Sequence, residues 1–314
     1  MSGSSRTAEY MALFRALETA RAPSVRLFSD PWAKSFLSPK LRLAAAAASL
    51  PPLHSAICAF IDWRWPGARS SGVARTRYID EALRRGVRDG LCQIVILGAG
   101  FDSRAYRIPA LAATRVFEVD QPETSLAKQR CLRKSLGRLP AHVAYVAFDF
   151  NRASPAEVMG DAGFDAGRPT FFLWEGVTNY LTERAVDATL RYVASAPAGS
   201  RILFTYIHRD VLRGGPAFAA DRRARSLVSN VGEPWTFGFE PAELPGYLRT
   251  RGLHLLCDVD SIAYRACYMG AEGRHLRGYE FYRIAVAEVS GRAGTSLGNP
   301  QTCAIPKEHH AESQ

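Results

Sequence analysis

The feature that most constrains the fold is a regular alternation of strand and helix patterns between residues 92 and 207. Residues 93–97 form a short β-branched run that ends in glycines, which is typical of a buried parallel strand entering a tight turn. Because strands that alternate with helices form parallel sheets with both faces covered, we expect an α/β fold. Further strand patterns follow at 115–120, 142–150, 169–177 and 200–207, with helical patterns at 122–136 and 182–194.

The segments outside this alternation predict additions to a main domain at 91–290. Residues before the first strand carry only helical patterns, so we expect an N-terminal helical extension or lid over 1–90. Residues 208–240 are too long for a plain connector and contain a basic run, so we expect an inserted cap there. The polar, glycine-containing segment 291–314 predicts a disordered tail.

The last two strand patterns, at 252–260 and 280–289, close the main domain. No helix-length amphipathic run separates them, so we expect the two strands to follow one another directly. A chain of 314 residues is long enough for about two domains or for one elaborated α/β domain.

Composition narrows the class of protein. The formal net charge of +10 suggests nucleic acid, anionic lipid or an acidic small molecule as a partner. The six cysteines lack metal-ligand spacing, so we expect reduced cysteines and no metal site. The N-terminus has no signal-peptide core, and the longest apolar stretch, 41–61, is interrupted by Pro51-Pro52. We therefore expect a cytoplasmic protein that does not bind membranes.

Glycines and carboxylates gather where the strand patterns end. Gly98 and Gly100 follow the first strand and would let a ligand approach the backbone, but Ser103 replaces the third glycine of a dinucleotide fingerprint. Asp120 comes 22 residues after Gly98, close to the spacing of a ribose-binding carboxylate. Each acidic residue could instead cap a helix, but together they favour an adenosine-type ligand with a cationic centre over a dinucleotide. The later acidic strand ends are Asp149 and Glu175.

Four segments and the Asp149-Phe150 pair carry a resemblance to a known family, and the segments are GVARTRYIDEAL, QIVILGAGFDSRAYR, VFEVDQPET and LWEGVTNYLTER. They resemble the leucine carboxyl methyltransferase-related family of class I S-adenosylmethionine-dependent methyltransferases, in its branch of bacterial natural-product O-methyltransferases. The resemblance covers roughly residues 6–289 and is most specific between Arg75 and Glu183. It implies a Rossmann-like sheet of seven strands whose last strand is antiparallel, and S-adenosyl-L-methionine as the cofactor, with S-adenosyl-L-homocysteine as its product.

The resemblance also implies roles for individual residues. Arg75 corresponds to the arginine that holds the methionine carboxylate, and Arg77 is the alternative in the same register. Asp120 corresponds to the ribose ligand, and Asp149 with Phe150 to the adenine contacts. The full set of expected cofactor-binding residues is Arg75, Gly98, Ala99, Gly100, Asp120, Gln121, Asp149, Phe150, Glu175, Gly176 and, from the N-terminal helices, Arg15.

The residues expected to act on the acceptor depend on its chemistry. A carboxylate acceptor is already ionised and needs no general base, whereas a phenol or alcohol needs help from a histidine or tyrosine. The catalytic candidates are Tyr206 and His208 after the fifth strand and Tyr180 after the fourth. The aromatic residues expected as acceptor-pocket walls, although core packing would also explain each, are Trp32, Trp63, Trp65, Phe218 and Trp235.

The sequence therefore predicts an O-methyltransferase that acts on a small molecule, with a carboxyl group of a natural-product intermediate as the favoured acceptor and an anionic acceptor allowed by the net charge. Alternatives are a hydroxyl (phenol) O-methyltransferase and a basic nucleic-acid-binding or RNA-modifying protein. An oxidoreductase would call for a glycine at Ser103. We expect no nucleic-acid partner and either a monomer or a homodimer.

Overall fold

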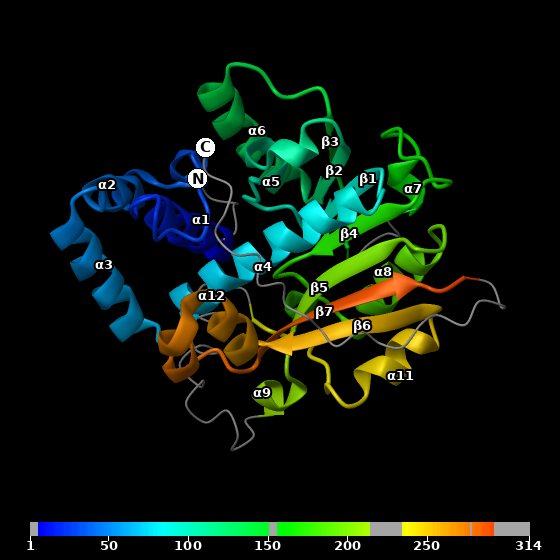
Figure 1. The fold of residues 1–314 in the computed structure, drawn as a ribbon. Helices are drawn as coiled ribbons and strands as arrows, with labels where there is room; N and C mark the ends of the chain where they lie inside the picture. Colours follow the sequence, from blue (N-terminus) through cyan, green and yellow to red (C-terminus); the bar gives the residue numbers. More distant parts are fainter. Residues whose placement is uncertain (1–5, 151–155, 214–233, 277, 292–314) are drawn as a thin grey trace.

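The computed structural model describes residues 6–150, 156–213, 234–276 and 278–291. Its centre is one seven-stranded sheet in the order β3-β2-β1-β4-β5-β7-β6 (Figure 1). The first five strands are parallel, and β7 runs antiparallel to both of its neighbours. The expected α/β sheet with an antiparallel last strand is thus confirmed. The strands are β1 Gln93–Leu97, β2 Arg115–Asp120, β3 Val143–Ala147, β4 Thr170–Trp174, β5 Arg201–Ile207, β6 Leu253–Asp260 and β7 Tyr282–Val289.

Apolar side chains of the central strands alternate between two cores because successive residues of a strand point to opposite faces. Ile94 and Ile96 of β1 pack with α4 and α12 on one face. Val95 and Leu97 pack with α8 and α11 on the other. The near-continuous hydrophobic run of β1 is therefore explained by burial on both sides. The helices named here are α4 Ala68–Arg88, α8 Glu183–Ala194, α11 Leu244–Arg249 and α12 Ser261–His275.

The N-terminal helices form a third core beside the sheet. The inner side of α1, including Leu13, Phe14 and Leu17, packs against Phe36 and Leu37 and reaches Phe101 behind β1. Figure 1 shows α2 and α3 extending outward from α1, while α4 lies along the sheet. These elements are α1 Arg6–Thr19, η1 Ala33–Phe36, α2 Pro39–Ala47 and α3 Pro51–Arg64. The shorter and remaining helices are α5 Arg104–Arg107, η2 Pro109–Leu111, α6 Pro122–Leu136, α7 Ala156–Met159, η3 Thr178–Tyr180 and α9 Arg209–Arg213.

The expectation that no helix separates the last two strands is wrong. Helix α12 occupies this connection, and Tyr264 from its first turns donates to or accepts from the Ser71 hydroxyl of α4 at 2.6 Å. Gly270 weakens the helical pattern in the sequence, and in the structure the helix is kinked at this residue, where φ is 60°. The Asp260 side chain accepts from the Ala263 N–H at 2.9 Å, so an N-cap signal was present.

Several expected additions lie largely outside the described residues. Of the expected cap at 208–240, the structure describes α9 and residues 234–240, and of the expected tail it describes Gly291. After Asp30-Pro31 the chain forms only the single turn η1. None of the helices that the structure describes has the length and apolar character needed to cross a membrane.

The cysteines follow the sequence-based expectation in part. Cys58, Cys92, Cys131 and Cys267 are free thiols, as expected. Cys257 lies on β6, with its sulfur 3.4 Å from the Tyr78 hydroxyl oxygen. Cys303 lies outside the described residues.

Candidate cofactor and acceptor site

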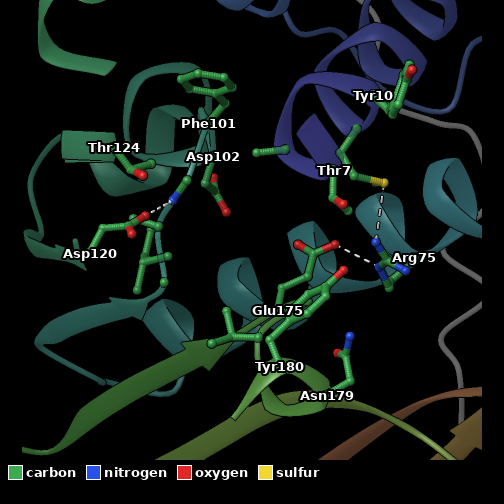
Figure 2. A pocket seen from close by; sticks show the side chains of 18 of the residues that line it. Thr7, Tyr10, Arg75, Phe101, Asp102, Asp120, Thr124, Glu175, Asn179 and Tyr180 are labelled. Carbon is green, nitrogen blue, oxygen red and sulfur yellow. Dashed lines mark hydrogen bonds and ion pairs between the residues drawn. The ribbon is translucent and has the colours of Figure 1, made fainter. Parts of the chain in front are cut away.

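A cavity of about 820 Å³ lies at the carboxyl ends of the parallel strands, where open α/β sheets bind their ligands. Helix α1 closes its other side with Thr7, Tyr10 and Met11 (Figure 2). This volume is in the upper part of the range for a pocket that holds one drug-sized molecule. All eleven residues expected to bind the cofactor line this one cavity: Arg15, Arg75, Gly98, Ala99, Gly100, Asp120, Gln121, Asp149, Phe150, Glu175 and Gly176.

The turn after β1 is fixed by glycine and by a carboxylate. Gly98 has φ +67°, and a Cβ on it would lie 2.3 Å from the Val177 Cγ2 atom, so no other residue fits without a shift. The Asp120 carboxylate accepts the Gly100 N–H with one oxygen and the Gln121 N–H with the other at 2.7 Å. Burial raises the pKa of Asp120 above its ordinary value. Each oxygen keeps a lone pair that can accept from a ligand hydroxyl.

Arg75 rather than Arg77 reaches the cavity. The Arg75 Nε–H donates to the Glu175 Oε1 atom at 2.7 Å, and its guanidinium carbon lies 4.6 Å from the ring centre of Tyr282. The Arg75 Nη2 atom lies 3.5 Å from the Met11 sulfur, at the cavity side of α1 (Figure 2). Arg77 instead donates to Glu81 at 2.7 Å and to the Leu27 carbonyl at 3.0 Å, outside the lining.

Glu175 joins this arginine to a second buried arginine. The Arg104 Nη1 atom donates to Glu175 Oε2 at 2.8 Å, and Nε donates to Asp80 Oδ1 at 2.9 Å. Arg104 also pairs with Asp102, which projects into the cavity from the turn (Figure 2). Burial alone would raise the pKa of Glu175, but Arg104 and Arg75 lower it below its usual value. The pKa of Asp102 falls to about 2 because Arg104 and Lys128 outweigh its burial.

Arg15 holds the N-terminal helix against the same turn. Its Nη2–H donates to the Phe101 carbonyl at 2.6 Å, and its Nε–H donates to Asp30 at 2.8 Å. Asp30 also accepts the Ser103 hydroxyl at 2.5 Å. Arg15 lines the cavity, but its ion pair and backbone bond tie α1 to the glycine turn, which makes it a positioning residue for the turn. This group was not visible in the sequence, since its members come from segments far apart.

The structure corrects the expected position of Tyr206. This residue is completely buried in the sheet core and does not line the cavity. Its hydroxyl donates to Asp258 Oδ2 on β6 at 2.8 Å, and its ring packs edge-on against Phe239. A side chain in this position cannot reach a methyl acceptor in the cavity. The error arose because the side chains of a strand alternate between faces, and Tyr206 points to the face away from the ligand.

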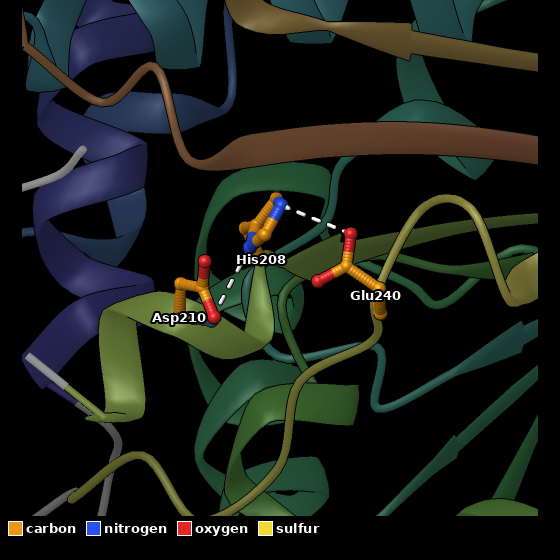
Figure 3. A group of neighbouring side chains, drawn as sticks. All are labelled: His208, Asp210 and Glu240. Carbon is orange, nitrogen blue, oxygen red and sulfur yellow. Dashed lines mark hydrogen bonds and ion pairs between the residues drawn. The ribbon is translucent and has the colours of Figure 1, made fainter. Parts of the chain in front are cut away.

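His208 also lies away from the cavity lining. Its Nδ1 accepts the Asp210 backbone N–H at 3.2 Å, and its Nε2 lies 3.5 Å from Glu240 Oε1 (Figure 3). One ligand-type atom from each of these three residues falls within 4.8 Å of the others. All three side chains are partly exposed and no further observation points to an ion, so we assign no site here.

Some of the other residues predicted on the acceptor side line the cavity, and others lie outside it. Tyr180 lines the cavity beside Glu175 (Figure 2), and so do Trp65 and Trp235. Trp32 does not line it and donates its indole N–H to the Tyr106 carbonyl at 3.3 Å. Trp63 is 73% exposed on α3. Phe218 lies outside the described residues.

Asn179 is a lining residue that sequence reasoning missed. It is 1% exposed, and its side-chain oxygen has no hydrogen-bond partner among the described residues. A buried polar group without a partner costs about 1–3 kcal/mol, so such an atom beside a cavity needs an explanation. The signal was its place in the TNY segment directly after the fourth strand, between residues already singled out. Tyr282 and Asp102 were missed as lining residues as well.

The sequence of this chain is similar to those of known proteins. A family model described as "Leucine carboxyl methyltransferase" matches residues 8–194. A protein of Frankia alni is 36% identical over 224 residues, which is 71% of this chain and 74% of that protein. A protein of Streptomyces coelicolor is 36% identical over 226 residues, covering 70% and 75%. Both carry the name "Putative S-adenosyl-L-methionine-dependent methyltransferase".

A solved structure supports the fold. The crystal structure of a "putative methyltransferase" from Thermobifida fusca aligns with a TM-score of 0.57, 18% sequence identity, and coverage of 88% of this chain and 97% of that chain. A protein from Streptomyces avermitilis described as a duf574 family protein aligns with a TM-score of 0.54 at the same identity, covering 87% and 99%. At this identity the likeness shows the arrangement of the sheet and helices, and the residues of the cavity are argued from this chain alone.

Proposed function

This chain belongs to the leucine carboxyl methyltransferase family, and from that premise we propose that it methylates an oxygen atom of a small molecule, with a carboxylate as the acceptor group. Its relatives are named as S-adenosyl-L-methionine-dependent methyltransferases, and S-adenosyl-L-methionine is its cofactor. One observation supports a carboxylate as the acceptor group: the described lining of the cavity contains no histidine, lysine or cysteine.

The charges around the cavity suit this cofactor. The described lining contains four acidic residues and three arginines, so a ligand with a cationic centre is favoured over one with a pyrophosphate. When bound, the cofactor supplies a methyl group already activated on a sulfonium. Arg75 would hold its carboxylate with the nitrogens that Glu175 leaves free, and Asp120 would accept from the ribose hydroxyls. Asp149 and Phe150 would contact the adenine.

The described lining of the cavity offers no ordinary general base to an acceptor. Among the described residues that line the cavity there is no histidine, lysine or cysteine. Glu175 and Asp102 are paired with arginines that lower their pKa values, and this makes them weak proton acceptors. A carboxylate acceptor is ionised at neutral pH and needs only to be aligned with the methyl group and shielded from water.

A hydroxyl acceptor is the second candidate, and Tyr180 favours it. Tyr180 is the one of the three predicted catalytic residues that lines the cavity. A tyrosine can take part in moving the proton of a phenol or alcohol, but it is a weaker base than histidine at neutral pH. Tyr180→Phe would stop the transfer to a hydroxyl and leave the transfer to a carboxylate nearly unchanged.

Labelled-methyl transfer into cell extract or a metabolite panel tests the proposal. We expect a methylated small molecule whose label is released by mild base, as an ester requires. A base-stable product would show ether formation and contradict the carboxyl assignment. Arg75→Ala should abolish transfer, whereas the matched variant Arg77→Ala, which removes a guanidinium two residues away and outside the cavity, should retain it. Equal losses in both variants would contradict the placement of the cofactor carboxylate.

A further inference from the structure

The Asn179 side chain is built into the cavity floor as a rigid hydrogen-bonding group. It belongs to η3, directly after β4, and its neighbour Thr178 donates its hydroxyl to the Thr205 carbonyl of β5 at 2.7 Å. Figure 2 shows its amide beside Tyr180 and below Arg75. The Asn179 oxygen lacks a partner among the described residues although the side chain is buried. A native fold rarely keeps such an atom unless something else completes its bonding.

A second buried polar atom without a partner belongs to Trp235, another lining residue. The Thr236 N–H donates to the Asn179 carbonyl at 2.8 Å and its hydroxyl donates to the Leu181 carbonyl at 2.9 Å. These bonds fix Trp235 next to Asn179, with its ring 5.3 Å from that of Phe281. The Trp235 indole nitrogen is buried and has no acceptor within the described part of the chain. One acceptor atom and one donor atom without partners thus belong to lining residues whose backbones are joined through Thr236.

The lining of the cavity is rich in aromatic side chains. Tyr10 and Trp65 contact each other with ring centres 5.4 Å apart and planes tilted by 49°, and the lining also contains Tyr180, Tyr279 and Tyr282. Tyr279 has φ 61°, and among the described residues it is the sole non-glycine residue with a positive φ. A bulky side chain in this region is uncommon, and such backbone strain concentrates at ligand sites. Flat aromatic walls select a flat apolar ligand because ring faces and edges pack together.

We infer that the methyl acceptor is an aromatic carboxylic acid with a ring hydroxyl, whose O–H donates to Asn179 Oδ1 and whose oxygen accepts from the Trp235 indole N–H. A hydroxyl suits this pair because it is donor and acceptor at once. The inference rests on the proposed carboxyl methylation and adds the group that selects the acceptor. Asn179 and Trp235 are specificity-determining residues that bind the substrate away from the reacting carboxylate.

Equilibrium binding to the full chain saturated with S-adenosylhomocysteine tests this. The probes are benzoate and naphthoate, each with and without a hydroxyl group at every ring position, and cyclohexanecarboxylate as the non-aromatic control. We expect at least one hydroxylated acid to bind about tenfold tighter than its parent, since an unmatched buried hydrogen-bonding group is costly. The parent aromatic acids should bind more tightly than cyclohexanecarboxylate.

Two variants assign the preference to its residues. Asn179→Leu keeps the branched shape but removes both polar groups of the amide, and Trp235→Phe removes the indole N–H together with its five-membered ring. Each should reduce the affinity of the hydroxylated acid relative to its parent acid to under about threefold, with both acids measured on the same variant. Gln129→Leu, an amide-to-leucine change on α6 outside the cavity, should leave all affinities unchanged.

The outcomes separate this inference from the proposed function. Failure to bind S-adenosylhomocysteine, or a base-stable methyl product, would count against the proposed function. Cofactor binding and ester formation with no hydroxyl preference, or with a preference that survives both variants, would overturn the inference alone. No binding of any aromatic acid at millimolar concentration to the cofactor-loaded protein would overturn it as well.

Discussion

At the scale of single residues, Asp120 ends a parallel strand and holds two backbone N–H groups of the turn that it faces. Its Oδ1 and Oδ2 atoms therefore fix the turn and remain able to accept from a ligand. Burial raises the pKa of this carboxyl, so the surroundings tolerate the charge at some cost in free energy. A cis-diol that donates to the carboxylate would recover part of that cost.

Asp120→Ala should therefore weaken S-adenosylhomocysteine binding by at least about tenfold, because a charge-assisted hydrogen bond contributes about 1.5–3 kcal/mol. Calorimetric titration of the purified variant gives the affinity. Glu123→Ala removes an exposed carboxylate from the first turn of α6, outside the cavity lining, and should have no effect. An Asp120→Ala affinity within about twofold of the unaltered protein would disprove the assignment.

The lowered pKa of Asp102 predicts how its contribution to folding stability depends on pH. Its pKa of about 2 lies below the ordinary value of 3.8 because Arg104 and Lys128 outweigh the effect of burial. The depressed pKa means that ionised Asp102 stabilises the fold at pH values above its unfolded pKa. This stabilisation, on the order of 2 kcal/mol, should disappear as the pH falls through the interval between the two pKa values.

Urea unfolding of the wild type and Asp102→Asn at a series of pH values measures this contribution. The difference in unfolding free energy should be largest above about pH 5 and should shrink as the pH falls from about 4 toward 2. Asp161→Asn, which alters an exposed aspartate, serves as the control and should show a smaller pH-dependent difference. A constant difference between wild type and Asp102→Asn across the series would refute the ion-pair account.

The residues predicted to bind the cofactor all line one cavity, whereas those predicted on the acceptor side do not, and the difference has a physical reason. The carboxyl ends of parallel strands meet at one edge, so glycines and acids at successive strand ends converge on one cavity whatever the details of packing. The position of Tyr206 depended on which face of β5 it occupies, and β5 is buried on both sides. The Arg104–Glu175 contact joins segments 71 residues apart, which no local pattern reveals.

At the scale of elements, the backbone of the turn between β1 and α5 packs closely against the Val177 side chain at Gly98. Gly98 contributes both a positive φ and a missing Cβ, and these two requirements can be separated by comparison with Gly163. Gly163 has φ +79°, but a Cβ there would meet nothing within 4 Å. Substitution of Gly163 therefore measures backbone strain, and substitution of Gly98 measures strain plus the contact with Val177.

Gly163→Ala should reduce the free energy of unfolding by about 1–2 kcal/mol. Gly98→Ala should cost about 1–3 kcal/mol more, because its Cβ meets the Val177 side chain, and should weaken S-adenosylhomocysteine binding. Chemical denaturation and calorimetry give the two quantities. Combining Gly98→Ala with Val177→Ala should recover part of the lost stability. Equal costs for the two glycine substitutions would show that the contact with Val177 is unimportant.

The elements themselves show where sequence patterns fail. Helix α8 begins as expected, with the Thr182 hydroxyl accepting the Ala185 N–H at 3.2 Å, because its cap and apolar stripe agree. Helix α12 was missed although Asp260 caps it, because Gly270 and Gly273 interrupt the helical pattern. Gly273 has a packing reason: a Cβ there would lie 2.4 Å from the Arg265 carbonyl. Contacts with the rest of the fold therefore stabilise α12 where its local sequence pattern is weak.

At the scale of the whole molecule, the net charge of +10 does not mark the functional edge of the sheet. The described lining of the cavity has more acidic residues than arginines, and its three arginines, Arg15, Arg75 and Arg104, are all in ion pairs. Other arginines pair outside the cavity lining, such as Arg201 at the amino end of β5, which pairs with Asp89 and Glu288. A cavity with this balance attracts a sulfonium, and it gives a phosphate backbone no continuous basic groove.

We therefore expect no methyl transfer to nucleic acid. With labelled S-adenosylmethionine, the label in tRNA or duplex DNA should equal that of a blank without protein, while the small-molecule fraction of the same extract becomes labelled. The basic chain should still show weak retention of nucleic acid on filters at about 50 mM salt, and this should be lost at about 200 mM because it arises from counterion release. Arg75→Ala should leave that retention unchanged, since Arg75 is buried against Glu175 and Tyr282. Label in tRNA that disappears in Arg75→Ala but persists in Arg77→Ala would establish RNA as a substrate of this site and reverse the assignment of the acceptor.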